Sequence, residues 1–205
     1  MMRATTGDMF GGDWKQIDFG PEAGPGRPGQ VIRVHPQTGA RHMDWLSWGL
    51  LPHGTDNPAL APRPIHVRAE TVAELPMFAD AFRHRRAIVP ASDYYQQRTI
   101  GGAAQRFAIC SRDGQPMAIA GLWEAYVAAD RSVEKTYCII TVEATGAVAE
   151  IHDRMPLVLG EEDWPLWLGE VEGDPVSLLH RAASDKLVLR PASGKGRRGR
   201  DRAPR

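Results

Sequence analysis

The stretch MAIAGLWEAYVAADRSVEKTYCIITVEA, residues 117–144, contains two segments rich in β-branched, aromatic and other apolar residues. The turn signal AADRS (128–132) separates them, which is typical of two consecutive strands. Two similar segments precede this stretch, AIVPASDYYQQ (87–97) and QRFAICS (105–111), and the turn signal RDGQ (112–115) follows the second. Four strands in succession predict a meandering, largely antiparallel sheet.

A hairpin is predicted ahead of this sheet. QVIRVHP (30–36) and RHMDWLSWGLLP (41–52) have the composition of strands, and QTGA (37–40) lies between them as a turn signal. Pairing across so short a turn is the simplest arrangement. We therefore expect the first two strands to be antiparallel neighbours.

Helices are expected at the periphery. Thr71 and Glu74 have the spacing of a capping box, and the apolar residues that follow recur on one face, so a helix is predicted over 72–85. The predicted class is α+β, a single domain with a largely antiparallel, barrel-like sheet core and peripheral helices. The remaining predicted elements are short helices at 146–151, 161–169 and 174–183 and strands at 155–159 and 186–190.

The composition is that of a folded globular domain. The chain has 205 residues, of which 42% are hydrophobic and 24% charged, and a chain of this length buries roughly 70% of the surface of its unfolded form. We expect an irregular lead-in at 1–30, the domain at 31–192 and a disordered basic tail at 193–205. The tail holds six of the 25 basic residues and one of the 25 acidic ones, so the remainder has a net charge of −5.

The sequence predicts a monomeric cytoplasmic protein without a membrane partner. Its apolar runs are far shorter than the ~20 residues of a membrane span, and the N-terminal stretch lacks the apolar segment of a secretory signal. Cys110 and Cys138 lie in strand-like segments, so we expect reduced core thiols. His35 and His42 flank the hairpin turn and can approach each other. They lack carboxylates at matching spacing, and we expect neither a metal nor a cofactor.

Polar side chains interrupt the apolar segments at several places. Such groups must find partners or take part in chemistry. Each has a structural explanation by itself: Trp48 as a core aromatic, Arg68 with Glu70 as an ion pair at a sheet edge, and His152 as a hydrogen-bonded core histidine. No motif of nucleotide-binding proteins, zinc proteases or α/β-hydrolases is present. The segments that contain these polar residues are WGLLP (48–52), RAET (68–71), RAIVPA (86–91), GLWE (121–124), IIT (139–141) and HDRMP (152–156).

In this order and spacing, the segments resemble the SOS-response-associated peptidases, which sense abasic sites in single-stranded DNA. The resemblance extends from residue 31 to about residue 170. It implies the fold of that family, single-stranded DNA with an abasic site as the partner, and no cofactor. In the family a cysteine at the second position captures the ring-opened aldehyde of the abasic sugar. Its α-amine forms a Schiff base, and its thiol then closes a thiazolidine ring.

The resemblance assigns roles to matching positions. His152 and Gln96 stand where the family has the histidine and glutamate that assist proton transfer. Arg68 and His66 stand where an arginine and an asparagine bind the sugar and phosphate. The other expected DNA contacts are Arg154, as a phosphate ligand, Trp48, as a stacking face, and Thr141.

The sequence departs from the family pattern at the positions that carry the chemistry. Met2 occupies the position of the cysteine, and the first cysteine is Cys110, so the nucleophile is unknown. Gln96 replaces the glutamate, and glutamine is neither a general acid nor a general base. Gln97 stands where tryptophan is usual, and His66 where asparagine is. One explanation is an internal start that omits the cysteine. The other is a divergent member that kept the DNA groove.

Three functions follow from the resemblance. The first is covalent capture of abasic sites with an associated autopeptidase step. With an amine but no adjacent thiol, only a reversible imine would form, which borohydride would trap. The second is non-catalytic binding of single-stranded DNA through Arg68, Arg154 and Trp48. The third is a stable domain retained for a protein partner.

Overall fold

The computed structural model describes residues 23–181 and 186–192, so most of the predicted lead-in, Met2 included, and the predicted tail lie outside the described residues. Strand β1 begins at Pro28, two residues before the predicted strand. The elements in chain order are β1 (Pro28–Val34), β2 (Arg41–Trp48), β3 (His66–Arg68), α1 (Pro76–His84), β4 (Arg86–Ala91), β5 (Asp93–Ile100), β6 (Ala103–Ser111), β7 (Met117–Val127), β8 (Val133–Glu143), α2 (Gly146–Ala149), β9 (Arg154–Pro156), β10 (Val158–Leu159), η2 (Glu161–Asp163), α3 (Trp164–Leu168), η3 (Pro175–Leu178) and β11 (Leu187–Pro191).

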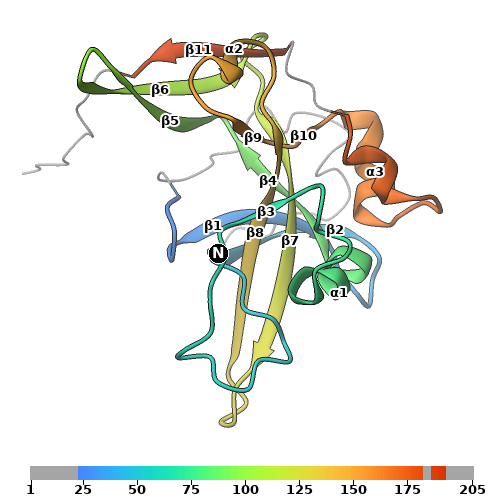
Figure 1. Ribbon diagram of the computed structural model, residues 1–205. Helices are drawn as coiled ribbons and strands as arrows, with labels where there is room; N and C mark the ends of the chain where they lie inside the picture. The colour runs from blue at the N-terminus through green and yellow to red at the C-terminus, as the bar shows by residue number, and fades with distance from the viewer. Residues whose placement is uncertain (1–22, 182–185, 193–205) are drawn as a thin grey trace, which may run out of the picture.

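The core of the molecule is a closed barrel of five strands. Strands β7, β4, β1, β2 and β8 pair in this order, and pairing of β7 with β8 closes the ring (Figure 1). Strand β10 adds to β7, while β3 and β9 both pair with β8. The pairings are antiparallel except those of β2 and β3 with β8. This architecture confirms the predicted class and the barrel-like core.

Closure of the barrel requires close contact between β7 and β8. Gly121 of β7 is paired with Ile139, and a Cβ atom at position 121 would lie 3.0 Å from the carbonyl oxygen of Cys138 and 3.1 Å from Val89. Glycine therefore allows the strands to approach at this point. Cys138 is fully buried in the core as a free thiol, as predicted, whereas Cys110 is half-buried.

A second sheet of three strands, in the order β11, β6, β5, lies across one end of β7 and β8 (Figure 1). The sequence predicted one continuous strand over 87–97, which is wrong. The chain bends at Ser92, so that β4 pairs with β7 in the barrel whereas β5 pairs with β6 in the second sheet. The predicted hairpin of β1 and β2 is confirmed.

Helix α1 begins later than the sequence indicated. It starts at Pro76, and its N-cap residue Leu75 makes no side-chain hydrogen bond. Proline fits the first helical turn, where its missing N–H is not needed, but not the second turn, where Pro76 would fall in a helix that begins at residue 72. Residues 71–75 form a turn in which the carbonyl oxygen of Thr71 accepts from the backbone N–H of Glu74 and of Leu75. The predicted start at residue 72 and the capping box are therefore wrong.

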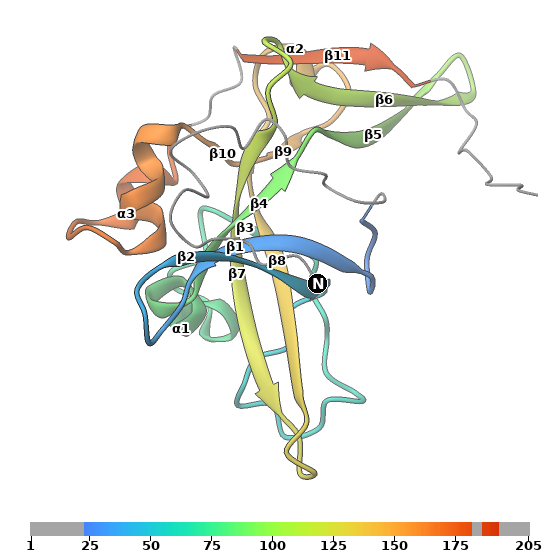
Figure 2. The ribbon, with the colours of Figure 1, turned by 180° about the vertical axis from the view of Figure 1, so that it is seen from behind.

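The two predicted closing helices have different outcomes. Residues 161–168 form η2 followed by α3, whose Trp167 is fully buried and packs against Phe82 of α1, with ring centroids 6.1 Å apart. Both helices accordingly lie on the same side of the barrel (Figure 2). In contrast, the described part of the helix predicted over 174–183 forms only the 3-10 turn η3, which buries Leu178, and residues 182 and 183 lie outside the described residues. No helix in the described part of the chain is long and apolar enough to cross a membrane.

Candidate functional site

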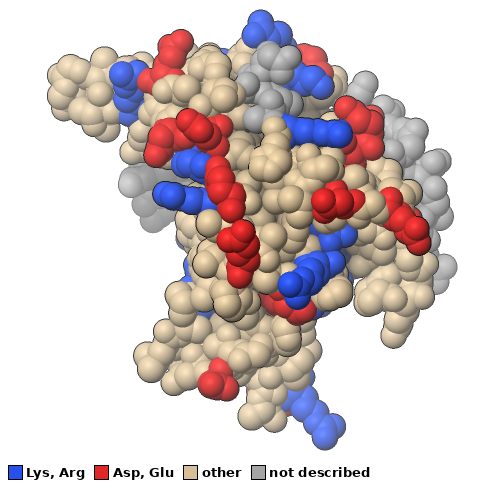
Figure 3. Space-filling view, turned by 45° about the vertical axis from the view of Figure 1, so that its right-hand side comes forward, with Lys and Arg blue, Asp and Glu red and all other residues tan. Residues whose placement is uncertain are grey.

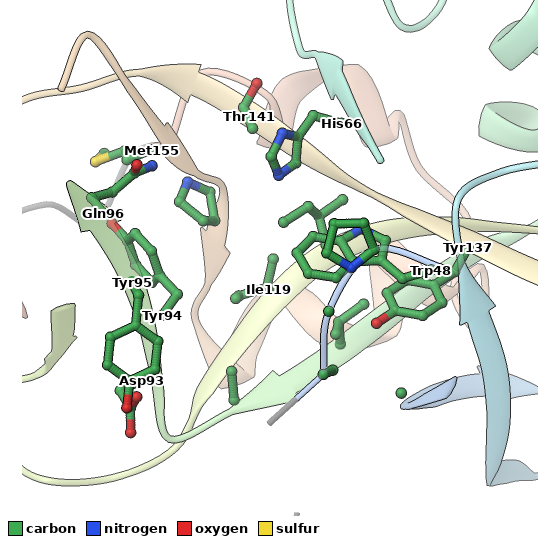
Figure 4. A pocket seen from close by; sticks show the side chains of 18 of the residues that line it. Trp48, His66, Asp93, Tyr94, Tyr95, Gln96, Ile119, Tyr137, Thr141 and Met155 are labelled. Atoms are coloured by element: carbon green, nitrogen blue, oxygen red, sulfur yellow. The ribbon is translucent and has the colours of Figure 1, made fainter. Parts of the chain in front are cut away.

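A pocket of about 820 Å³ lies between the barrel and the second sheet. The side chains of Asp93, Tyr94 and Gln96 on β5 line one side, and Trp48 and His66 lie across from them (Figure 4). All the site residues that the sequence predicted within the described chain line this pocket. They are Trp48, His66, Arg68, Gln96, Thr141, His152 and Arg154.

Strand β8 assembles the barrel side of the pocket. Its Thr141 is paired on one side with Arg68 of β3 and on the other with Pro156 of β9. Segments that are far apart in the sequence thus become adjacent strands. Because β3 carries His66 and β9 follows His152, the two imidazoles reach the same pocket.

His66 lies against an aromatic floor. Its ring meets Trp48 edge to face with centroids 5.8 Å apart, and Trp48 stacks on Tyr137 at 6.1 Å. The indole N–H of Trp48 donates to the carbonyl oxygen of Ile65 at 2.9 Å, which fixes the ring. His66 is exposed at the pocket surface, yet surrounding protein atoms lower its pKa by desolvation, and the charge of His152 lowers that pKa further. Neutral imidazole is therefore favoured here.

His152 is held by the backbone that follows it. Its Nδ1 accepts a hydrogen bond from the backbone N–H of Arg154 at 2.9 Å, and the carboxylate of Asp153 lies 3.1 Å from the same nitrogen. The carbonyl oxygen of Arg154 also lies 3.0 Å from Nδ1, so in the neutral ring Nδ1 either accepts from the backbone N–H or donates to one of the two oxygens, according to the tautomer. The side chain is 38% exposed, so His152 lines the pocket and is not a core residue.

Arg154 is anchored inside the protein. Its two terminal nitrogens each lie 2.8 Å from a different carboxylate oxygen of Glu70, and one of them also donates to the carbonyl oxygen of Thr141 at 2.6 Å. The hydrogen bond from Arg154 is the main reason that the pKa of Glu70 lies below its ordinary value. The ion pair proposed between Arg68 and Glu70 is therefore wrong, because Glu70 binds Arg154.

Arg68 is the open cation of the pocket. Its side chain is exposed, and among the described residues no ion pair engages its guanidinium. Glu70 still contributes an electrostatic interaction with Arg68. A guanidinium in this state is suited to bind a phosphate group in two hydrogen bonds.

The β5 side of the pocket was only partly foreseen. Gln96 is half-buried and is paired across the strands with Phe107. Its neighbours Tyr94 and Tyr95 also line the pocket. The tyrosine pair in the predicted strand was a visible signal. However, it indicated strand propensity and not a site, because the bend at Ser92 that turns β5 towards the pocket has no local pattern.

The described pocket contains few charges and no obvious nucleophile. Within the described chain, its lining includes neither a lysine nor a cysteine, and its one carboxylate is Asp93. Charges on the outer surface are mixed in sign, and Figure 3 shows acidic and basic side chains interspersed over one face. The electrostatic potential in the pocket therefore depends on the few charged side chains that line it.

A cluster away from the pocket has the composition of a metal site. The ligand atoms of His53, Asp80 and Glu124 lie within 4.8 Å of one another. However, Arg85 already supplies a cation there: its Nη2 atom is 2.9 Å from Glu124, 3.4 Å from His53 and in contact with Asp80. The cluster is thus an ion-pair network. His35 and His42 do approach each other, with ring centroids 5.2 Å apart.

The sequence of the whole barrel and second sheet matches one family. The model of the SOS response associated peptidase (SRAP) family matches residues 14–195. The chain belongs to the SRAP family. The match includes the segments that form the pocket, so the pocket is a feature of an SRAP domain.

Several relatives of this SRAP chain are named as abasic site processing proteins. The abasic site processing protein YedK of Escherichia coli is 34% identical over 137 residues, or 66% of this chain and 60% of that protein. The abasic site processing protein YobE of Bacillus subtilis is 31% identical over 131 residues, which are 63% of this chain and 60% of that protein. The chain thus aligns with about 60% of the length of these relatives.

Solved structures share the SRAP fold. A protein from Bordetella bronchiseptica superposes with a TM-score of 0.70 at 25% identity, covering 84% of this chain and 89% of that chain. A protein from Bacteroides thetaiotaomicron superposes with a TM-score of 0.71 at 20% identity, covering 82% of this chain and 75% of that one. The second likeness concerns the fold alone.

Proposed function

We propose that this chain binds single-stranded DNA at the pocket and recognises abasic sites there. The observation that carries the proposal is the position of the exposed guanidinium of Arg68 in one pocket with two imidazoles and the indole of Trp48. A volume of about 820 Å³ lies within the range of small-molecule sites and suits a sugar with its phosphate. Membership of the SRAP family and the names of the relatives support the same substrate.

Each side chain has a chemical task in this proposal. Arg68 binds the phosphate beside the abasic sugar, whereas Arg154, held by Glu70, fixes the pocket wall and adds positive potential. The Nε2 atom of His152 faces the ring-opened sugar and moves protons at its aldehyde oxygen. His66, neutral because its pKa is lowered, contributes a hydrogen bond to the sugar hydroxyls.

Covalent capture in this pocket requires an amine. An amine adds to the aldehyde carbon, the carbonyl oxygen leaves as water, and a C=N bond replaces the C=O bond. Closure of a thiazolidine ring requires a neighbouring thiolate. Neither Cys110 nor Cys138 lines the described pocket, and burial raises the pKa of the Cys138 thiol. We therefore propose that any adduct of the chain as written stops at the imine.

The decisive experiment mixes the full chain with single-stranded DNA containing one abasic site, with and without borohydride. A denaturing gel separates the products. A band that shifts only after reduction supports the imine. A stable band without reductant would overturn the proposed stop at the imine. No band in either lane, with binding retained on a native gel, identifies a non-catalytic DNA-binding function, which Gln96 at the glutamate position favours.

The binding part of the proposal has its own test. Arg68→Ala should weaken binding and lower the slope of log affinity against log salt by about one, because one phosphate contact is lost. Arg83→Ala is the matched control, because Arg83 is an exposed arginine on α1 and lies outside the pocket. Equal affinity and equal salt slopes for wild type and Arg68→Ala would contradict the proposed site.

A further inference from the structure

The side chain of Gln96 lines the pocket but cannot transfer protons. It lies across from His66 (Figure 4), and an amide is neither an acid nor a base near neutral pH. Proton transfer matters for the proposed substrate, because an abasic sugar is largely a closed ring and only its open form has an aldehyde. Ring opening moves a proton from the anomeric hydroxyl to the ring oxygen, and general acids and bases accelerate such steps. If the pocket opens the ring, another of its side chains accepts this proton.

Few of the groups that line the pocket can accept a proton at neutral pH. Arginines and tyrosines keep their protons, and burial raises the pKa of Tyr94 and of Tyr137 further. The carboxylate of Asp93 accepts from the hydroxyl of Ser92 at 3.0 Å, and Asp93 lies at the start of β5, about 10 Å along the strand from Gln96. The two imidazoles remain. The titratable and charged side chains of the lining are His66, Arg68, Asp93, Tyr94, Tyr95, Tyr137, His152 and Arg154.

The two histidines differ in the partners of their ring nitrogens. Nδ1 of His152 lies 2.9 Å from the backbone nitrogen of Arg154 and 3.0 Å from its carbonyl oxygen, which leaves only Nε2 for a ligand. In contrast, neither ring nitrogen of His66 makes a hydrogen bond with another described residue, and its side chain is exposed at the pocket. Both nitrogens of His66 are therefore available to a bound sugar.

His66 is also positioned and neutral, as a general base must be. Strand β3 pairs it with Ile139 in the barrel, and its ring meets that of Trp48 at an interplanar angle of 67°. Desolvation lowers the pKa of His66, and the charge of His152 lowers it further. At neutral pH the ring therefore has an unprotonated nitrogen. A histidine held on a rigid strand with a free lone pair meets the geometric and chemical requirements of proton transfer.

We infer that His66 is the general base that opens the ring of the bound abasic sugar, a step that the facing Gln96 cannot assist. The anomeric O–H bond breaks and its proton passes to the unprotonated ring nitrogen of His66. The C1′–O4′ bond breaks as the C1′=O bond forms, and O4′ takes a proton from water. His66 then returns its proton to water, so no further reactant is consumed. The inference rests on the proposed function and deepens it, because it names the residue through which the site reaches the aldehyde.

Exchange between the two closed forms of the sugar measures this step. The α and β anomers interconvert through the open form, so a single strand with ¹³C at C1′ of one abasic site gives two NMR signals that exchange as the ring opens. The full chain, in substoichiometric amount, should raise the exchange rate. His66→Asn should lower the added rate about 100-fold, the low end for general acid–base catalysis.

The pH profile distinguishes a base from a residue that only shapes the pocket. As pH falls below 6.5, the ordinary pKa of histidine, the rate added by wild type should decrease, because His66 gains a proton and loses its free lone pair. His66→Asn should lack this part of the decrease. Addition of Gln96→Glu to His66→Asn should restore exchange, since it places a carboxylate across the pocket. Addition of Gln37→Glu, at an exposed glutamine outside the pocket, should not.

A second strand separates binding from chemistry. Tetrahydrofuran in place of the abasic sugar has no anomeric hydroxyl and cannot open, so wild type and His66→Asn should bind this strand with equal affinity. Equal exchange rates for wild type and His66→Asn would overturn the inference, and so would a loss that falls on Asp93→Asn instead. Binding by wild type without faster exchange would also overturn it, while the proposed function stands. Failure of wild type to bind either strand would overturn both.

Discussion

The guanidinium of Arg154 makes two hydrogen bonds of 2.8 Å with the carboxylate of Glu70, which lies 84 positions earlier in the chain. This pair joins the segment after β3 to β9 beside the pocket and neutralises one of its two arginines. Arg68 remains the open cation. The electrostatic character of the pocket therefore depends on an acidic residue that does not line it.

Glu70→Gln should tighten binding of single-stranded DNA. The amide still accepts from Arg154 but removes a negative charge near both arginines, and one unit charge close to a phosphate is worth about 1 kcal/mol in water, or about five-fold in affinity. Because Glu70 is half-exposed, the free energy of unfolding should fall by no more than about 1 kcal/mol. Fluorescence anisotropy at low salt measures the affinity. Glu74→Gln, an exposed acidic residue outside the pocket, should have no effect, and unchanged binding by Glu70→Gln would contradict the prediction.

Gln96→Glu should accelerate formation of the borohydride-trapped adduct. A carboxylate at this half-buried position restores a group that exchanges protons with the bound aldehyde, and general acid–base catalysis contributes at least about 10²-fold. The rate of band formation on a denaturing gel measures the effect. Gln37→Glu is the matched control, because Gln37 is an exposed glutamine in the turn between β1 and β2 and lies outside the pocket. Equal rates for the two variants would show that position 96 carries no proton transfer.

Glu124→Ala should destabilise the fold strongly. Glu124 is 2% exposed and pairs with Arg85 at 2.9 Å. Removal of one partner from a buried pair costs about 3 kcal/mol or more, and we expect the low end because Asp80 still binds Arg85. Urea denaturation provides the measurement. The exposed pair of Glu134 with Arg63 serves as the control, and Glu134→Ala should cost less than about 1 kcal/mol. Similar losses for the two variants would contradict the assignment.

His66 should make stability depend on pH on the acidic side. Its pKa in the folded protein is lowered from the ordinary 6.5, so the unfolded chain binds the proton first as pH falls. The free energy of unfolding therefore decreases as pH falls from about 6.5 towards the folded pKa, and this contribution is constant below that value. His66→Gln should remove this part of the decrease, as measured by urea midpoints at several pH values. His180→Gln, at an exposed histidine outside the pocket, should keep the wild-type profile. A His66→Gln profile identical to wild type would contradict the prediction.

Local patterns predicted much of the secondary structure. The segment predicted at 117–127 coincides with β7, and the turns on both sides of it are confirmed. Alternation and turn residues act over a few positions, so they are visible in the sequence. The start of α1 was misplaced because Pro76 outweighed a plausible capping box. The bend at Ser92 was missed because strand propensity continues through it.

Motifs in order indicated the SRAP family and which residues gather in the pocket. They did not indicate the partners of those residues. Arg68 is two positions from Glu70 in the chain, yet Glu70 binds Arg154. The two segments meet because β3 and β9 both pair with β8 at Thr141. Ion-pair choice depends on distance in space, and sequence separation is a poor guide to it.

By itself, the sequence determined the strands, the hairpin, the family and the residues with the chemistry of the pocket. These follow from side-chain size, polarity and turn propensity, which are local properties. Only the tertiary structure decided that β7 and β8 close the barrel, that β5 leaves it for a second sheet, and that Arg106 stacks on Tyr95. These features depend on which distant strands pair, and such pairings become stable only when the whole core is packed.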